Sequence, residues 1–333
     1  MGKIRVNGTI LDITEDDREM LKATASSDED KATKYRQALA LTLEKAWKQG
    51  VLEPDLNFGI FDRIMVAAGA DVKFPVDFFA PGTEGYYAAV KVPREGAIPE
   101  RVIEGDEIYV PTFKIANGIS WDLDYAKDGR WDIIGRAIEV FTNGFVQKIN
   151  DEGWHVVLYA ASTHTVQNDS SASSGVMSKQ LITTLQTAIK RFTGGRNSRV
   201  TDLFLSPEAI ADIRNFDNTA LDDLTLRNLL ISGEDGVPQL FGVKLHELQE
   251  LGVGQEYQTY LTGTLSASLA AGDAEFVVAL DLLNRDSFVM PVREDLTMYN
   301  DPTLTRKMRA GVFGWMRVGF AALDTRRALL GSL

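Results

Sequence analysis

Residues 131–160 read WDIIGRAIEVFTNGFVQKINDEGWHVVLYA, and this stretch decides the fold of the 333-residue chain. Large apolar side chains recur in it with the four-three-four-four spacing of one helix face: Ile134, Ile138, Phe141, Phe145 and Ile149. We expect a helix from Trp131 to about Ala161, about 46 Å long at 1.5 Å per residue. Gly144 and Gly153 each disfavour it by about 1 kcal/mol relative to alanine. Tertiary packing must therefore hold this helix, and we interpret it as a structural spine.

Two strands joined by a charged tip are predicted ahead of the spine. Residues 86–91 alternate in strand fashion, the polar tip PREGAIPER covers residues 93–101, and a second extended run goes from Ile108 to Trp121. A hairpin alone buries too little surface to be stable. We expect it either to pack on its own domain or to lie across a neighbouring molecule.

The chain closes on a run of strict alternation. One side of this run is apolar, with Met308, Ala310, Val312, Met316, Val318 and Phe320. The other side carries Arg309, Phe313, Trp315 and Arg317. The pattern predicts a strand of some 13 residues, well beyond the usual length.

A compact region of mixed helix and strand is predicted between the spine and the closing strand. It follows a Ser-rich surface loop at residues 162–178 and starts with a helix over residues 179–192. A buried strand around residues 200–205 then runs into Ser206-Pro207, an N-cap and first-turn proline that predict a further helix. More strands are predicted at residues 241–245, 276–282 and 288–292.

The N-terminal part is strongly acidic. Residues 11–31 hold eight acids against three basic side chains, which predicts a solvated, partly mobile arm. An amphipathic helix is expected from about Asp30, with a stripe of Tyr35, Leu39, Leu43 and Trp47. This stripe needs a partner from another domain or another subunit.

Composition excludes several classes of function. The chain has 47 acidic and 35 basic residues, a formal net charge of −12 and no cysteine. Disulfides and zinc–thiolate sites are therefore excluded, and a dedicated nucleic-acid module is disfavoured because it needs clustered cations. No targeting signal opens the sequence and no apolar run is long enough for a membrane helix, so we expect a soluble protein made in a cytoplasm.

Motifs for catalysis or metal binding are sparse. His246 opens HELQE, but Glu250 stands where a zinc-protease helix needs its second histidine. His155 falls inside the spine, and His164 has no nucleophile-elbow sequence to support a triad. The acids around Asp124 lack calcium-loop spacing and fit the N-terminus of a helix better. We therefore predict no catalytic, cofactor-binding or metal-binding residue, no cofactor and no enzymatic activity.

The order of elements resembles that of the major capsid proteins of tailed bacteriophages, whose fold is shared with encapsulins. Four segments carry the resemblance: PREGAIPERV at 93–102, the spine, RVTDLFLSPEAIADIRNF at 199–216, and TRKMRAGVFGWMRVGFAALD at 305–324. The resemblance implies an α+β capsid fold. By the resemblance, the chain divides into an N-terminal arm (1–75), an extended hairpin loop (80–118), a peripheral domain with the spine (119–175 and 300–333) and an axial α/β domain (176–299).

The resemblance also implies the partners. These are identical subunits in the hexamers and pentamers of an icosahedral shell, packaged double-stranded DNA contacted non-specifically, possible scaffolding, portal or decoration proteins, and no membrane. The shell would be the virion capsid, assembled in the host bacterial cytoplasm. The candidate inter-subunit contacts are Arg94, Glu95, Glu100, Arg101, Tyr35 and Trp47.

Covalent cross-linking between a hairpin Lys and a peripheral Asn occurs in some capsid proteins, but we do not expect it here. Lys91 lies before the tip, and no Glu stands between Asn300 and Lys307. Two alternatives to the phage capsid stay open: an encapsulin-like compartment shell, which would need a groove for a cargo peptide, and an α/β enzyme with an unrecognised site.

Overall fold

The computed structural model describes thirteen stretches of the chain: residues 2–6, 9–13, 15–24, 30–40, 59–67, 69–75, 107–128, 130–167, 175–193, 198–216, 238–269, 275–283 and 287–333. The chain divides into two compact units, each built from three separate segments. The first unit takes Met1–Val72, Val110–Gly153 and Met290–Phe320. The second takes Lys73–Tyr109, Trp154–Val289 and Ala321–Leu333.

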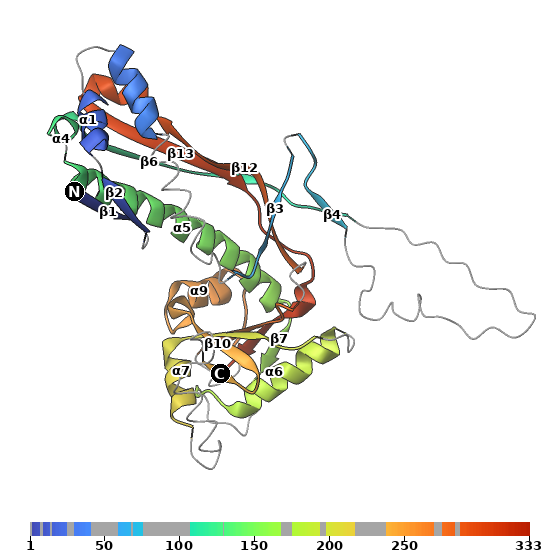
Figure 1. Cartoon of the computed structure of the whole chain (residues 1–333). Helices are drawn as coiled ribbons and strands as arrows, with labels where there is room; N and C mark the ends of the chain where they lie inside the picture. The colour runs from blue at the N-terminus through green and yellow to red at the C-terminus, as the bar shows by residue number, and fades with distance from the viewer. Residues whose placement is uncertain are drawn as a thin grey trace, which may run out of the picture. The chain divides into compact units, whose positions relative to one another are not determined.

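The first unit is built on a sheet of long antiparallel strands (Figure 1). β13 (Arg309–Val318) lies between β6 (Phe113–Asp122) and β12 (Phe288–Asn300), and β3 (Asp62–Met65) pairs with β12. The register of β13 on β6 is unbroken from the pair Arg309–Asp122 to the pair Val318–Phe113. β12 begins in the second unit, where Phe288 and Val289 pair with β14 (Ala321–Ala322).

The alternation predicted for the closing strand is confirmed in its centre. Ala310, Val312, Met316 and Val318 are buried, and Phe313, Trp315 and Arg317 are only partly so. Met308 was expected on the apolar side, and this expectation is wrong. It has a positive φ of 55° and an exposure of 76%, because it lies in the turn between the 3₁₀ segment η5 (Pro302–Lys307) and β13.

The spine helix is confirmed. α5 runs from Trp131 to Ser162, and its stripe Ile134, Ile138, Phe141, Phe145 and Ile149 is buried. The Asn117 side chain of β6 donates a hydrogen bond to the Phe141 carbonyl, 3.4 Å away. A Cβ at Gly144 would lie 3.3 Å from that Asn117 amide nitrogen. Gly144 disfavours the helix by its propensity, but it also allows the helix and β6 to lie close together.

The N-terminal segments are more ordered than predicted. β1 (Gly2–Val6) pairs with β2 (Thr9–Ile13), and the helix α1 (Glu15–Thr24) falls within the stretch expected to be a mobile arm. α1 packs next to the short helix α4 (Leu123–Lys127), with Leu21 fully buried. Residues 30–40 are helical, as predicted, and the Arg36 side chain there donates to the Thr24 carbonyl at 3.0 Å.

The second unit is a six-stranded mixed sheet with helices. The strand order is β7 (Thr165–Gln167), β15 (Ala328–Ser332), β11 (Phe276–Leu280), β8 (Asp202–Leu205), β10 (Val243–Glu247) and β9 (Gln239–Leu240). The β15–β7 and β8–β10 pairs are parallel, and the others are antiparallel. A separate small pair joins β4 (Lys73–Pro75) to β5 (Glu107–Tyr109).

Helices α6 (Lys179–Phe192) and α7 (Pro207–Arg214) bury their apolar faces in the core of this sheet. Both start as the sequence predicts, because the Ser178 and Ser206 hydroxyls accept hydrogen bonds from the Leu181 and Ala209 amides. The remaining segments are η2 (Gln249–Leu251), α9 (Glu256–Thr259), η3 (Tyr260–Thr264) and η6 (Thr325–Arg327).

Three sequence expectations need correction. The Ser-rich stretch contains strand β7. The sequence did not predict this strand, because β7 lies at the edge of a sheet and has no apolar periodicity. Phe241 was expected in a strand but lies in the turn between β9 and β10. β12 continues to Asn300 rather than ending near Val292. Among the described residues, no helix combines the length and apolar character that crossing a bilayer requires.

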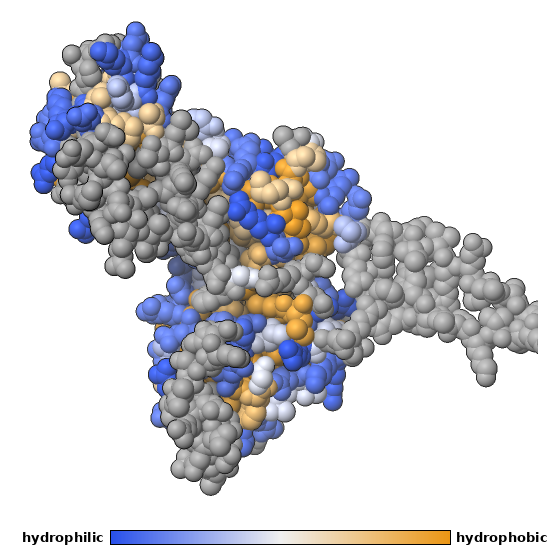
Figure 2. Space-filling view, viewed as in Figure 1, coloured by the Kyte–Doolittle hydropathy of each residue, from blue (hydrophilic) through white to orange (hydrophobic). Residues whose placement is uncertain are grey.

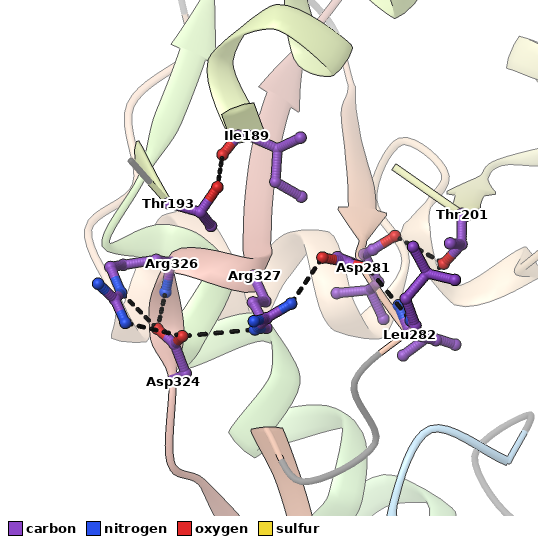
Figure 3. Close-up of polar contacts among 10 residues, drawn as sticks. Ile189, Thr193, Thr201, Asp281, Leu282, Asp324, Arg326 and Arg327 are labelled. Atoms are coloured by element: carbon purple, nitrogen blue, oxygen red, sulfur yellow. Dashed lines mark hydrogen bonds and ion pairs between the residues drawn. The ribbon is translucent and has the colours of Figure 1, made fainter. Parts of the chain in front are cut away.

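A buried ionic network joins the end of β11 to η6 (Figure 3). The Asp281 carboxylate is completely buried and accepts from Arg327 at 2.8 Å, and Arg327 also lies 3.4 Å from Asp324. Arg326 makes two further hydrogen bonds to Asp324. Burial raises the pKa of Asp324, but the hydrogen bonds from Arg326 outweigh it and hold that pKa below its ordinary value.

Replacing the central ring of the spine tests its packing. Phe141→Ala removes a side chain that is 2% exposed and 5.5 Å from the Phe145 ring, so we expect a loss of about 3–5 kcal/mol of unfolding free energy. Its neighbour Val140 is 62% exposed, and Val140→Ala should change stability by no more than about 0.5 kcal/mol. Urea denaturation of the two variants makes the comparison. Equal midpoints would mean that Phe141 is not part of a packed core.

Breaking the buried ion pair tests the second unit. Asp281→Asn removes the buried carboxylate charge that pairs with the Arg327 guanidinium, and we expect a loss of about 3 kcal/mol in unfolding free energy. Glu107→Gln is the matched control in the same unit, since its pair with Lys73 is solvent-exposed and contributes about 0.5 kcal/mol or less. The measurement is thermal unfolding followed by circular dichroism. The account of the network fails if the two variants melt together.

Candidate assembly surfaces

One of the six predicted contact residues can be located. Tyr35 lies in the helical stretch 30–40 and is 42% exposed, while Leu39, one turn further on, is 3% exposed. Of the predicted stripe, the Leu39 side chain is therefore buried against this chain, and the Tyr35 side chain is exposed. The other five candidates lie outside the described residues: Trp47, Arg94, Glu95, Glu100 and Arg101.

Three aromatic rings stack on the open face of the first unit's sheet. Tyr299 of β12 lies opposite Phe313 of β13, and Trp315 follows on the same side of β13. The Tyr299 and Trp315 ring centroids are 4.6 Å apart with planes 18° from parallel, and Phe313 is within 5.8 Å of both. Tyr299 is 44% exposed. We call these three residues the aromatic row.

Charged groups border the aromatic row. The Lys114 ammonium lies 5.6 Å from the Trp315 ring centroid and 3.8 Å from the Glu294 carboxylate. Arg317 donates to the Thr112 hydroxyl at 3.1 Å. An apolar centre with a mixed, solvated charged rim is the composition of protein–protein interfaces. The face therefore suits contact with another protein surface better than contact with a uniformly charged partner.

The row was only half visible in the sequence. Phe313 and Trp315 were placed on the outward side of the closing strand, and the structure confirms this. Tyr299 was missed because β12 was expected to end near Val292. The alternation of buried Leu296 and Met298 with Thr297 and Tyr299 was the signal that would have extended the strand.

The second unit also exposes apolar side chains, and hydrophobic groups reach the surface among hydrophilic ones in Figure 2. The described residues of this unit with large exposed apolar side chains are Tyr109, Tyr159, Val176, Phe241, Val253 and Leu283. Single exposed apolar residues are normal on protein surfaces. A surface role has to be argued residue by residue.

The histidines have structural surroundings. The His246 ring stacks on Phe204 at 4.8 Å, and its Nε2 lies 2.7 Å from the Asp202 carboxylate. Burial raises the pKa of Asp202, but the hydrogen bonds from His246 and Thr201 lower it by more. The pKa of Asp202 is therefore below its ordinary value. Because His246 lies on strand β10, HELQE does not form the helix that a zinc protease needs.

The other two histidines also pack against rings. His155 lies 4.3 Å from the Tyr260 ring, and His164 lies 4.7 Å from Phe192. Burial lowers the pKa of His164, which favours its neutral form. In the part of the chain that the structure describes, no three His, Asp or Glu side chains are grouped as a metal site would require.

Two sets of acids have local structural explanations. The Asp122 side chain accepts from the Asp124 amide at 3.0 Å and caps α4, as the sequence predicts. Glu275 is 5% exposed and accepts a hydrogen bond from the Ser206 hydroxyl. Burial raises the pKa of Glu275, and the charges of Glu208 and Asp212 add to that rise.

Comparison with known proteins depends on the fold, since the sequence alone finds no relative. No protein-family model matches the chain, and no curated protein matches it. Solved structures do match. The capsid of the cyanophage P-SCSP1u aligns with a TM-score of 0.53 and 12% identity over 82% of this chain and 86% of its own.

Two more structures agree. A chain in the asymmetric unit of the mature capsid of bacteriophage PhiM1 aligns with a TM-score of 0.51 and 11% identity, covering 83% of this chain and 86% of its own length. The structure from Microbacterium phage Oxtober96 aligns with a TM-score of 0.51 and 14% identity, covering 83% and 90%. At identities this low, the structural alignments establish the fold of the chain but not its function. The chain has the α+β, HK97-type fold of bacteriophage capsid proteins, as the element order predicted.

Proposed function

We propose that this chain is the major capsid protein of a tailed bacteriophage, and that its copies assemble into an icosahedral head around double-stranded DNA. The observation that carries the proposal is the capsid fold, which extends over 82% of the chain in the match to the cyanophage capsid. Known structures with this fold include the capsid of the cyanophage P-SCSP1u and the asymmetric unit of the mature capsid of bacteriophage PhiM1. A role in a shell is the simplest use of the same architecture.

The surface chemistry supports self-association. A closed shell is built from many separate contacts per subunit. On the first unit, the aromatic row with its charged rim and the exposed Tyr35 are both compatible with burial against another copy. An apolar centre with a charged rim favours contact with another protein surface. We propose a structural protein without enzymatic activity or cofactor.

The charge balance supports a container for DNA. The net charge of −12 makes strong attachment of the genome to the wall unfavourable, since phosphates bind through clustered Lys and Arg. DNA would then be contacted only non-specifically and could be packaged and released. The shell would form in the bacterial cytoplasm and persist as the virion capsid, with scaffolding, portal or decoration proteins as further partners.

The division of labour follows the same proposal. Residues 1–75 serve as an N-terminal arm and residues 80–118 as an extended loop that overlaps a neighbour. The end of this loop, residues 113–118, belongs to β6 and pairs with β13 of the same chain. We propose residues 119–175 with 300–333 as the peripheral domain and residues 176–299 as the axial domain at the fivefold and sixfold axes. The sheets cross these bounds, because β7 and β15 pair in the second unit's sheet and β12 pairs with β13 in the first. In this arrangement Tyr35, Trp47 and the four tip charges are contacts between subunits.

Assembly of the purified protein tests the function. We expect size-exclusion chromatography to show species far above the 36.7 kDa subunit, and negative-stain images to show rings of five or six copies or closed hollow shells. A single species at the subunit mass over a wide concentration range, with no ring or shell in the images, would contradict the proposal.

Charge reversal at the tip tests the loop assignment. Replacing Arg94, Glu95, Glu100 and Arg101 by residues of opposite charge should impair particle formation. Folding should be nearly unchanged, because surface substitutions usually alter stability by about 0.5 kcal/mol or less each. The readouts are particle yield by electron microscopy and the thermal midpoint of the subunit. Normal yield from the reversed tip would remove the loop from the contact surface.

A further inference from the structure

The hairpin between β9 and β10 carries an aromatic residue in an unfavourable backbone conformation. Val243 pairs with Leu240, so the connecting loop has only two residues, Phe241 and Gly242. Their φ angles are both positive, at 52° and 76°. Two successive positive φ values are the pattern of a type I′ turn, whose first position favours Asn, Asp or Gly. A bulky aromatic side chain at such a position is uncommon and strained.

Among the described residues, no ring packs against the Phe241 side chain to offset this strain. The Phe241 side chain is 48% exposed. Among the ring contacts between described residues, none involves Phe241, whereas most other aromatic residues of this unit's core pack ring to ring. An Asn at this place would form the same turn without strain. Phe241 thus destabilises the turn while its phenyl ring is exposed to solvent.

The position of the tip is nevertheless fixed. The Gln186 side-chain amide of α6 donates a hydrogen bond to the Phe241 carbonyl at 3.1 Å. The residues beside Gln186 and one turn further on, Leu185 and Ile189, are buried in the core of the second unit. β10 is paired in parallel with β8 inside the sheet. The ring is therefore carried on a rigid support, which reduces the entropy that a binding partner would have to overcome.

We propose that Phe241 is a contact residue between subunits, an aromatic anchor that the β9–β10 tip inserts into an apolar surface of a second copy of this chain. Strained residues persist where the strained conformation is used. Aromatic side chains on rigid supports are the groups that dominate the energy of protein interfaces. The second copy is the partner because this inference rests on the proposed shell function, in which the nearest surfaces around a subunit belong to its copies.

Substitution by Asn separates the two effects of the residue. Phe241→Asn keeps the turn and removes the ring. We expect the melting temperature of the dilute, unassembled subunit to rise by roughly 2–4 °C as the strain is relieved. The protein concentration at which particles form should rise about tenfold or more, because a central aromatic contact is lost. Phe241→Tyr retains a ring and should leave both quantities near those of the unmodified protein.

Gln186→Ala is a second variant that leaves the ring in place. It loosens the support of the tip, and we expect a smaller rise in the assembly concentration with no gain in melting temperature. If the unmodified protein forms no particles, the proposed shell function fails. If it assembles and both Phe241→Asn and Gln186→Ala assemble at the same concentration, the anchor is overturned while the shell function stands. That result would also exclude a copy as the partner of the tip.

Discussion

The buried stripe along α5 is the interaction on which the rest of the structure depends. Its Phe141 and Phe145 rings are buried in the first unit, and further along the same helix Trp154 packs edge-on against Phe204 in the second. One helix of 32 residues thus supplies core to both units. A helix of that length with internal glycines is sustained by tertiary burial rather than by propensity. At Gly144 the helix lies close to β6, because an added Cβ would be 3.3 Å from the Asn117 amide nitrogen, which donates to the Phe141 carbonyl.

Burial on the inner side has a consequence for the outer side. Long strands that bury one face expose another, and in the first unit that face carries the aromatic row beside Lys114. The second unit combines a core that contains the fully buried Asp281 with an exposed Phe241 side chain, whose backbone has a positive φ. Both units therefore bury large apolar side chains in their cores and leave other apolar groups exposed. Contact with identical copies would bury those groups without any change of fold.

Periodicity predicted the elements whose own sequence decides them. The bounds of α5 and α6, the Ser206-Pro207 start of α7 and the alternation of β13 follow from helical or strand spacing within one segment. Features set by distant partners were missed. β7 exists because it pairs with β15, and the outward Tyr299 depends on an extension of β12 along β13. The left-handed turn at Phe241 contradicts local preference, so no local rule could predict it. The surface side chains were predicted less well than the core for this reason.

The central claim is that this polypeptide completes its burial on copies of itself. The most direct measurement is the thermal unfolding midpoint of the unmodified protein as a function of its concentration, with the mass of the folded species recorded at each point. Association stabilises the folded state by mass action, so we predict a midpoint that rises with concentration as the mass grows beyond 36.7 kDa. A midpoint that stays constant while the protein remains at the subunit mass would contradict the account.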